Sequence, residues 1–131
     1  MCDIKSKIAL AKESIILIDD YVDESTLEIL ESKQDNVEVF VYSKNRLMFK
    51  MRNIKRRKCF RAGFHFSETK RFKNRFILID NKFLFLLSRP IRCNGRRSFW
   101  FIQMFDIDYI SKLRQHIREC EGETNAQYRH F

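Results

Sequence analysis

The sequence predicts a single α/β domain with a mixed β-sheet flanked by helices, in the approximate order αβαβαββββα. Helix-like and strand-like segments alternate in the first part of the chain, an order that favours parallel strands joined by helical crossovers. Several strand-like segments with turn residues between them follow, and two of these are expected to pair as a hairpin. The 131 residues, 44% of them hydrophobic, suit one packed core, and no linker or repeat divides the chain.

The first 42 residues show two helix-strand pairs. Apolar residues at helical spacing precede the isoleucine-rich first strand, and alternating valines mark the second strand. Either Asp23 or Ser25 can cap the second helix, since Glu28 follows Ser25 at the spacing of a capping box. The expected elements are helices over 3–12 and 23–30 and strands over Ile15–Ile18 and Val37–Tyr42.

The remaining elements are expected in the order helix, four strands and helix. Apolar residues at helical spacing beneath a run of cations predict a helix or an irregular basic arm over 45–57. Alternating phenylalanines then predict a strand with one solvent-facing side, and Asn81-Lys82 predicts the turn of the hairpin. Asp106 is the expected cap of the last helix. The expected bounds are 59–66, 75–80, 83–87 and 98–104 for the strands, 88–97 for a loop, 106–119 for the closing helix and 120–131 for a loose tail.

Positive charge is concentrated in the middle third of the chain. The net charge is +9, yet residues 1–42 carry four Lys or Arg and ten Asp or Glu. Residues 43–79 carry thirteen Lys or Arg, and Glu68 is their only acidic residue. A face that merely keeps a protein in solution usually mixes both signs. The segment therefore favours a polyanion such as nucleic acid as partner, although its interleaved phenylalanines are also what a half-buried strand requires.

The most informative motif is the segment F-K-N-R-F-I-L-I-D over 72–80. It resembles the H-x-K/R-x4-D box of phospholipase D-like phosphodiesterases, whose prophage-type members read roughly H-D-R-F, three hydrophobic residues and D. In that family the His attacks phosphorus, the basic residue holds phosphate oxygens and the Asp belongs to the same polar cluster. Here Lys73 stands at the His position, and a protonated ammonium has no lone pair for attack. The resemblance therefore implies a phosphate site at Arg75 and Asp80 without the family's chemistry.

The resemblance extends over most of the chain. Residues 14–22 and 37–45 resemble the family's first two strands, and residues 86–104 resemble its loop of small residues, basic pair and aromatic strand, with Ser88 and Pro90 as departures. The resemblance implies a phospholipase D-like fold over 1–131. It also implies a homodimer in which two copies of Lys73 and Arg75 share one cleft, or pairing with an active relative.

Candidate phosphate contacts come from both the charge and the resemblance. Arg75 reads as a phosphate clamp or as a surface Arg at a strand start, and Asp80 reads as its partner or as the end of a strand before a turn. His65 could replace the missing nucleophile from a neighbouring strand, or it could be structural. The candidate residues for binding phosphate or nucleic acid are Arg52, Lys55, Arg56, Arg57, Lys58, Arg61, Lys73, Arg75, Arg96 and Arg97.

No metal or cofactor is expected. The four Cys residues form no C-x-x-C pair and are expected to be free thiols. His116 and Cys120 are four residues apart on the closing helix but lack a third ligand. No apolar run approaches the roughly 20 residues that cross a bilayer, and the start of the chain is broken by charges, so we expect a cytoplasmic protein without a membrane partner or a signal peptide.

The hypothesis that best fits the sequence is a catalytically degenerate phospholipase D-like domain that binds nucleic acid or another phosphate-bearing polyanion. One alternative is an active, metal-independent nuclease or phosphodiesterase with a substituted nucleophile. A second is a phage or mobile-element protein that binds and inhibits an acidic host defence or nuclease protein, since relatives of this domain are associated with phage genes.

Overall fold

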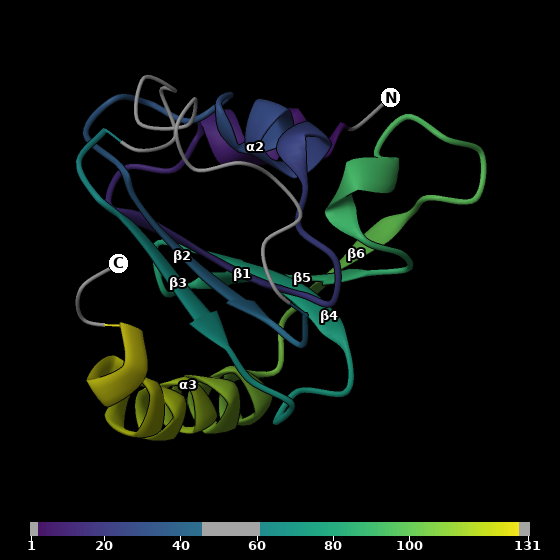
Figure 1. Ribbon diagram of the computed structural model, residues 1–131. Helices are drawn as coiled ribbons and strands as arrows, with labels where there is room; N and C mark the ends of the chain where they lie inside the picture. Colours follow the sequence, from purple (N-terminus) through teal and green to yellow (C-terminus); the bar gives the residue numbers. More distant parts are fainter. Residues whose placement is uncertain (1–2, 46–60, 129–131) are drawn as a thin grey trace.

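A computed structural model describes residues 3–45 and 61–128, which form one mixed sheet with helices on both faces (Figure 1). The strands are β1 (Ser14–Asp19), β2 (Glu38–Ser43), β3 (Phe64–Glu68), β4 (Arg75–Ile79), β5 (Phe83–Leu87) and β6 (Phe101–Met104). The helices are α1 (Ile4–Ala9), α2 (Glu24–Leu30), the short 3₁₀ helix η3 (Ile91–Cys93) and α3 (Ile107–Tyr128).

The sheet divides into a parallel half and an antiparallel half. Its six strands lie in the order β3-β2-β1-β4-β5-β6, with β1, β2 and β3 parallel to one another. Strand β4 runs antiparallel to β1, and β5 and β6 continue the antiparallel pairing. This arrangement confirms the expected α/β class with a mixed sheet, while most of the helix or arm predicted over 45–57 lies outside the described residues.

The apolar run of β1 is explained by burial on both of its faces. Ile15 and Leu17 pack into a core with α1 and α2, whereas Ile16 and Ile18 pack into a second core with Leu113 and other residues of α3. Figure 1 shows α2 on one side of the sheet and α3 on the other. A strand covered on both faces needs apolar residues at successive positions, which is what the sequence supplies.

The predicted hairpin between β4 and β5 is confirmed, with a left-handed turn. Asp80 and Asn81 have φ angles of 55° and 58°, a region that Asp and Asn tolerate better than most residues. The backbone N–H of Lys82 donates to the carbonyl of Ile79 across this turn. The strand ends at Ile79, one residue before the predicted boundary.

Asp23, one of the two residues expected to cap α2, is its cap, because Asp23 exchanges capping hydrogen bonds with Thr26. Several element boundaries differ from the sequence predictions. Strand β3 begins at Phe64 instead of residue 59, since Ala62 and Gly63 turn the chain with φ angles of 69° and 116°.

The last helix is longer than predicted. Helix α3 continues to Tyr128, whereas the sequence predicted an end at residue 119 and a loose tail. The added segment contains one Gly, no Pro and several residues with good helix propensity, so no residue in it forces the helix to stop. Among the described residues, no helix is long and apolar enough to cross a membrane.

Candidate functional site

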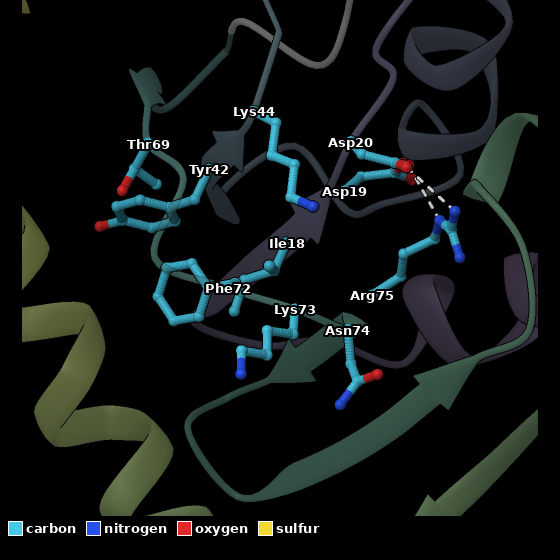
Figure 2. Close-up of a pocket in the computed structure, with 10 residues that line it drawn as sticks. All are labelled: Ile18, Asp19, Asp20, Tyr42, Lys44, Thr69, Phe72, Lys73, Asn74 and Arg75. Atoms are coloured by element: carbon cyan, nitrogen blue, oxygen red, sulfur yellow. Dashed lines mark hydrogen bonds and ion pairs between the residues drawn. The ribbon is translucent and has the colours of Figure 1, made fainter.

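A small pocket opens at the edge of the sheet where the parallel strands end. Its lining comes from the ends of β1 and β2, the segment after β3 and the start of β4 (Figure 2). The cavity measures about 110 Å³. Ligands of open α/β sheets usually bind outside the carboxyl ends of the strands, so the position itself indicates a binding site. The lining residues are Ile18, Asp19, Asp20, Tyr42, Lys44, Thr69, Phe72, Lys73, Asn74 and Arg75.

Arg75 and Asp20 form a bidentate ion pair in this pocket. Nε and Nη2 of Arg75 donate to the two carboxylate oxygens of Asp20 at 2.8 and 2.9 Å. The antiparallel pairing of β1 with β4 brings the start of β4 next to the end of β1, within reach of this ion pair, because Ile18 lies opposite Phe76. Partial burial acts to raise the pKa of Asp20, but the hydrogen bonds and charge of Arg75 outweigh it and lower that pKa below its ordinary value.

Asp19 is buried beneath this ion pair and is only 2% exposed. Its carboxylate accepts hydrogen bonds from the backbone N–H groups of Ile91 and Tyr21 at 2.8 and 3.1 Å. Burial raises the pKa of Asp19 to about 7, and although the two hydrogen bonds oppose this rise, the neighbouring charge of Asp20 supports it. The carboxyl of Asp19 is therefore the group in the pocket that changes charge near neutral pH.

Two lysines line the same pocket from different strand ends. Figure 2 shows Lys44 pointing toward the two aspartates, whereas Lys73 and Asn74 point away from them. The position of Lys44 is fixed by the next residue, because the side-chain amide of Asn45 donates to the backbone carbonyl of Asp20 at 2.6 Å. The pocket thus combines three cations, one ionised carboxylate and one that titrates near neutrality. Its net charge is positive at pH 7.

The structure separates the residues of the predicted motif. Lys73 and Arg75 line the pocket, while Asp80 lies at the far end of β4. There the carboxylate of Asp80 accepts hydrogen bonds from the backbone N–H groups of Lys12, Glu13 and Ser14 at 2.7 to 3.2 Å. Asp80 therefore holds the start of β1 and the turn after β4, and it does not pair with Arg75.

His65 is the second residue of β3 and does not line the pocket. Its Nε2 is 2.6 Å from Oε2 of Glu38, and its ring stacks on Phe40 with a centroid distance of 4.6 Å. The register pairs His65 with Phe40, three residues before the end of β2 at Ser43. This placement favours the structural interpretation of His65.

The other predicted contacts are scattered. Arg61 pairs with Asp35 at 3.3 Å before β3, and Arg96 and Arg97 are exposed in the loop after η3 without lining the pocket. Ser88 accepts from the backbone N–H of Trp100 at 2.8 Å and so has a structural role in that loop. The remaining basic candidates lie outside the described residues: Arg52, Lys55, Arg56, Arg57 and Lys58.

The described residues provide no obvious metal site. No group of three or more His, Cys, Asp and Glu side chains among them is placed to hold a metal ion. Cys120 lies 3.4 Å from Oγ1 of Thr69, whereas His116 is exposed on α3. Cys93 and Cys120 are both free thiols, while Cys2 and Cys59 lie outside the described residues.

Three polar residues that line the pocket were not predicted from the sequence, namely Asp19, Asp20 and Thr69, whereas Lys44 belongs to the predicted basic segment. A signal for the two aspartates was present, because paired carboxylates follow directly on a buried apolar strand. The strand order was needed to show that the start of β4 meets them there.

Comparisons with known proteins identify the fold. No protein-family model matches the chain, and no curated protein matches its sequence. Among solved structures, NucT from Helicobacter pylori aligns with a TM-score of 0.65 and 12% identity, over 92% of this chain and 86% of NucT. Nuc from Salmonella typhimurium, a phospholipase D family member, aligns with a TM-score of 0.64 and 16% identity, over the same shares.

A third solved structure shares the fold over part of its length. TrmBL2, an archaeal chromatin protein whose structure shows a novel mode of DNA binding, aligns with a TM-score of 0.51 and 11% identity. The alignment covers 92% of this chain but only 48% of TrmBL2. Together the likenesses show that the chain has a phospholipase D-like fold, as the sequence resemblance implied.

Proposed function

We propose that this phospholipase D-like domain binds nucleic acid, or another phosphate-bearing polyanion, and does not hydrolyse it by the family's route. The observation that carries the proposal is the positive pocket at the strand ends, which is lined by Lys44, Lys73 and Arg75. The DNA-binding mode described for TrmBL2, which shares part of its fold with this chain, supports nucleic acid as the ligand class.

The geometry of the cations suits phosphate oxygens. Asp20 occupies two N–H groups of Arg75 and holds the guanidinium in place, so its remaining N–H groups are oriented before a ligand arrives. Lys44 adds a point charge over the aspartates, and Lys73 adds a second at the outer side of the pocket. A phosphate group that enters the pocket would meet Lys44 and Arg75, with Lys73 at the outer side to contact the same or an adjacent phosphate.

We expect no hydrolysis because Lys73 stands at the position of the family's nucleophile. Lys73 is exposed at this position, and a lysine ammonium lacks the lone pair that attack on phosphorus requires. His65, near the start of β3, bonds to Glu38 at the start of β2 and does not line the pocket. We therefore expect the chain to bind a phosphodiester without cleaving it.

The basic segment of the sequence supports a polyanion as the ligand. Thirteen cations lie within 43–79, and three of them, Lys44, Lys73 and Arg75, line the pocket. The homodimer that the family resemblance implies stays a prediction. It would bring two such pockets together.

Binding and cleavage can be tested in one experiment. Purified protein is mixed with labelled single-stranded and duplex DNA and with RNA, binding is followed by fluorescence anisotropy, and the recovered strands are sized on a gel. We expect binding that weakens with salt, strands recovered intact with or without a chelator, and weaker binding by Lys73→Ala. Lys82→Ala is the matched control, because Lys82 is equally exposed in the turn after β4 and does not line the pocket.

Two outcomes would overturn the proposal. Failure to bind any of the nucleic acids at low salt would remove the binding function. Strand cleavage that persists with chelator and disappears in Lys73→Ala would show that the chain is an active phosphodiesterase, with Lys73 in its catalytic machinery.

A further inference from the structure

We propose that a groove beside the pocket holds an unstacked nucleobase, so that the ligand is single-stranded nucleic acid. This inference rests on the proposed function, and it adds the form of nucleic acid that the same site takes. The groove is called the base groove below. Its apolar lining comes from Phe72, Phe76, Tyr109 and Leu113, and Lys73 and Lys112 add charge to it.

The base groove and the phosphate pocket are neighbours with a common wall. Phe72, Lys73 and Asn74 line both of them. Figure 2 shows Lys73 and Asn74 turned away from the aspartates of the pocket. A strand with one phosphate in the pocket could therefore place an adjacent base in the base groove without leaving the surface.

The size and lining of the base groove suit a flat aromatic group. Its volume is about 300 Å³, which lies at the lower end of the range of roughly 300–1,000 Å³ for small-ligand sites. Phe76 is only 3% exposed, whereas Tyr109 is 36% exposed. The two ring centroids lie 6.0 Å apart with the planes inclined at 57°. Phe76 is thus a buried part of the lining, and Tyr109 offers a ring that a base can reach and stack on.

Tyr109 is positioned by the first turn of α3. Its backbone N–H donates to the carboxylate of Asp106 at 3.2 Å, which caps this helix start. Lys112 and His116 follow Tyr109 by three and seven residues, so they share one helix face with it. The exposed Lys112 on this face can reach a phosphate next to a base held at Tyr109.

The base groove favours a single strand over a duplex for an energetic reason. Stacking on an aromatic side chain requires a base whose face is free, and the bases of a duplex are already stacked and paired. Placing a duplex base in the base groove would require flipping it out of the helix, which costs a few kcal/mol. An unpaired strand avoids this cost.

The test compares two ligands with equal charge. A short oligothymidylate and an abasic oligomer of the same length present the same phosphates, but only the first offers bases. We expect the wild-type chain to bind the oligothymidylate about 5- to 150-fold more tightly at one salt concentration, since stacking on an aromatic side chain has this effect per base. Tyr109→Ala should remove this preference and leave binding of the abasic oligomer unchanged, while Tyr109→Phe should retain it. Lys112→Ala, the charge control, should weaken both complexes by a similar factor.

The outcomes separate this inference from the proposed function. Equal wild-type affinity for the two oligomers would overturn the base groove while leaving polyanion binding intact, and this comparison needs no variant to fold. Equal loss of both affinities in Tyr109→Ala would also overturn it. Failure of the wild-type chain to bind either oligomer would instead overturn the proposed function.

Discussion

At the scale of single residues, the pocket depends on two aspartates that are adjacent in sequence and differ in environment. Asp20 faces Arg75 and has a lowered pKa, whereas burial raises the pKa of Asp19 to about 7. The buried carboxyl also holds the loop after β5 through the backbone of Ile91. One aspartate thus fixes a cation of the pocket, and the other links the pocket charge to pH.

Asp19 should make stability depend on pH between about pH 4 and 7. The folded chain keeps the proton of Asp19 up to about pH 7, whereas an unfolded chain releases it near pH 4. Because the folded state binds more protons in this interval, the free energy of unfolding should fall as pH rises through it and level off above pH 7. We expect the free energy of unfolding measured in urea to fall over this pH interval in the wild-type chain, and to fall less in Asp19→Asn.

The aspartates with lowered pKa act in a different interval. The stability from Asp3, Asp20 and Asp80 is lost as pH falls below their ordinary pKa of 3.8, so it does not disturb the interval above pH 4. Asp108→Asn, at an exposed position, should follow the wild type throughout. Parallel curves for the wild type and Asp19→Asn between about pH 4 and 7 would contradict a protonated Asp19 in the folded state.

The site was only partly predictable from residues alone. Lys73 and Arg75 belong to a recognisable motif, and the structure places both in the pocket. The ion pair with Asp20 could not be derived, because it depends on β4 lying antiparallel to β1 with Ile18 opposite Phe76. The sequence indicated the charge of Arg75 and gave no signal for its partner.

At the scale of elements, β4 connects two functions at its two ends. Arg75 begins the strand in the pocket, and Asp80 follows its last residue with three backbone N–H groups as partners. The spacing between a basic residue and an aspartate therefore spans one strand. In this chain β4 thus carries Arg75, which lines the pocket, at one end and Asp80, which has a structural role, at the other.

Asp80→Ala should lower stability without weakening ligand binding. The substitution leaves the N–H groups of Lys12, Glu13 and Ser14 without their acceptor and removes a residue that tolerates the left-handed φ of 55°. We expect the free energy of unfolding in urea to fall by about 1–2 kcal/mol, as for hydrogen bonds to a charged group at a partly exposed site.

The Asp80→Asn variant is the matched control, since it keeps an acceptor oxygen and a residue that tolerates this turn, and its loss should be smaller. A large drop in oligonucleotide affinity in folded Asp80→Ala would contradict the structural role. It would instead place Asp80 with the pocket, as the family resemblance had suggested.

The elements with strong sequence signals were predicted well. The apolar run of Ile15–Ile18 indicated a buried strand and Asn81-Lys82 indicated a hairpin turn, and the structure confirms both. The start of β3 was wrong because alternation alone does not show that Ala62 and Gly63 adopt positive φ angles. The predicted end of α3 at residue 119 was wrong because the sequence has no clear stop signal before Tyr128.

At the scale of the whole molecule, the sheet places the site where its two halves meet. The parallel strands end at one edge, and the antiparallel strand β4 starts from that same edge beside β1. The pocket therefore collects residues from segments that are far apart in sequence, from Asp19 to Arg75. Helix α3 covers the neighbouring face and supplies Tyr109 and Lys112 to the base groove.

If the pocket cations neutralise phosphates of a bound strand, the salt dependence of binding should change when these cations are removed. The measurement is the slope of log K against log salt for one single-stranded oligonucleotide, in which each neutralised phosphate contributes about −0.7. We expect the slope of the double variant Lys44→Ala/Lys73→Ala to be flatter than the wild-type slope by about 1.4. The control is Lys5→Ala/Lys82→Ala, which removes two exposed lysines that do not line the pocket. Its slope should equal that of the wild type. An unchanged slope in Lys44→Ala/Lys73→Ala would contradict the neutralisation of bound phosphates by the pocket cations.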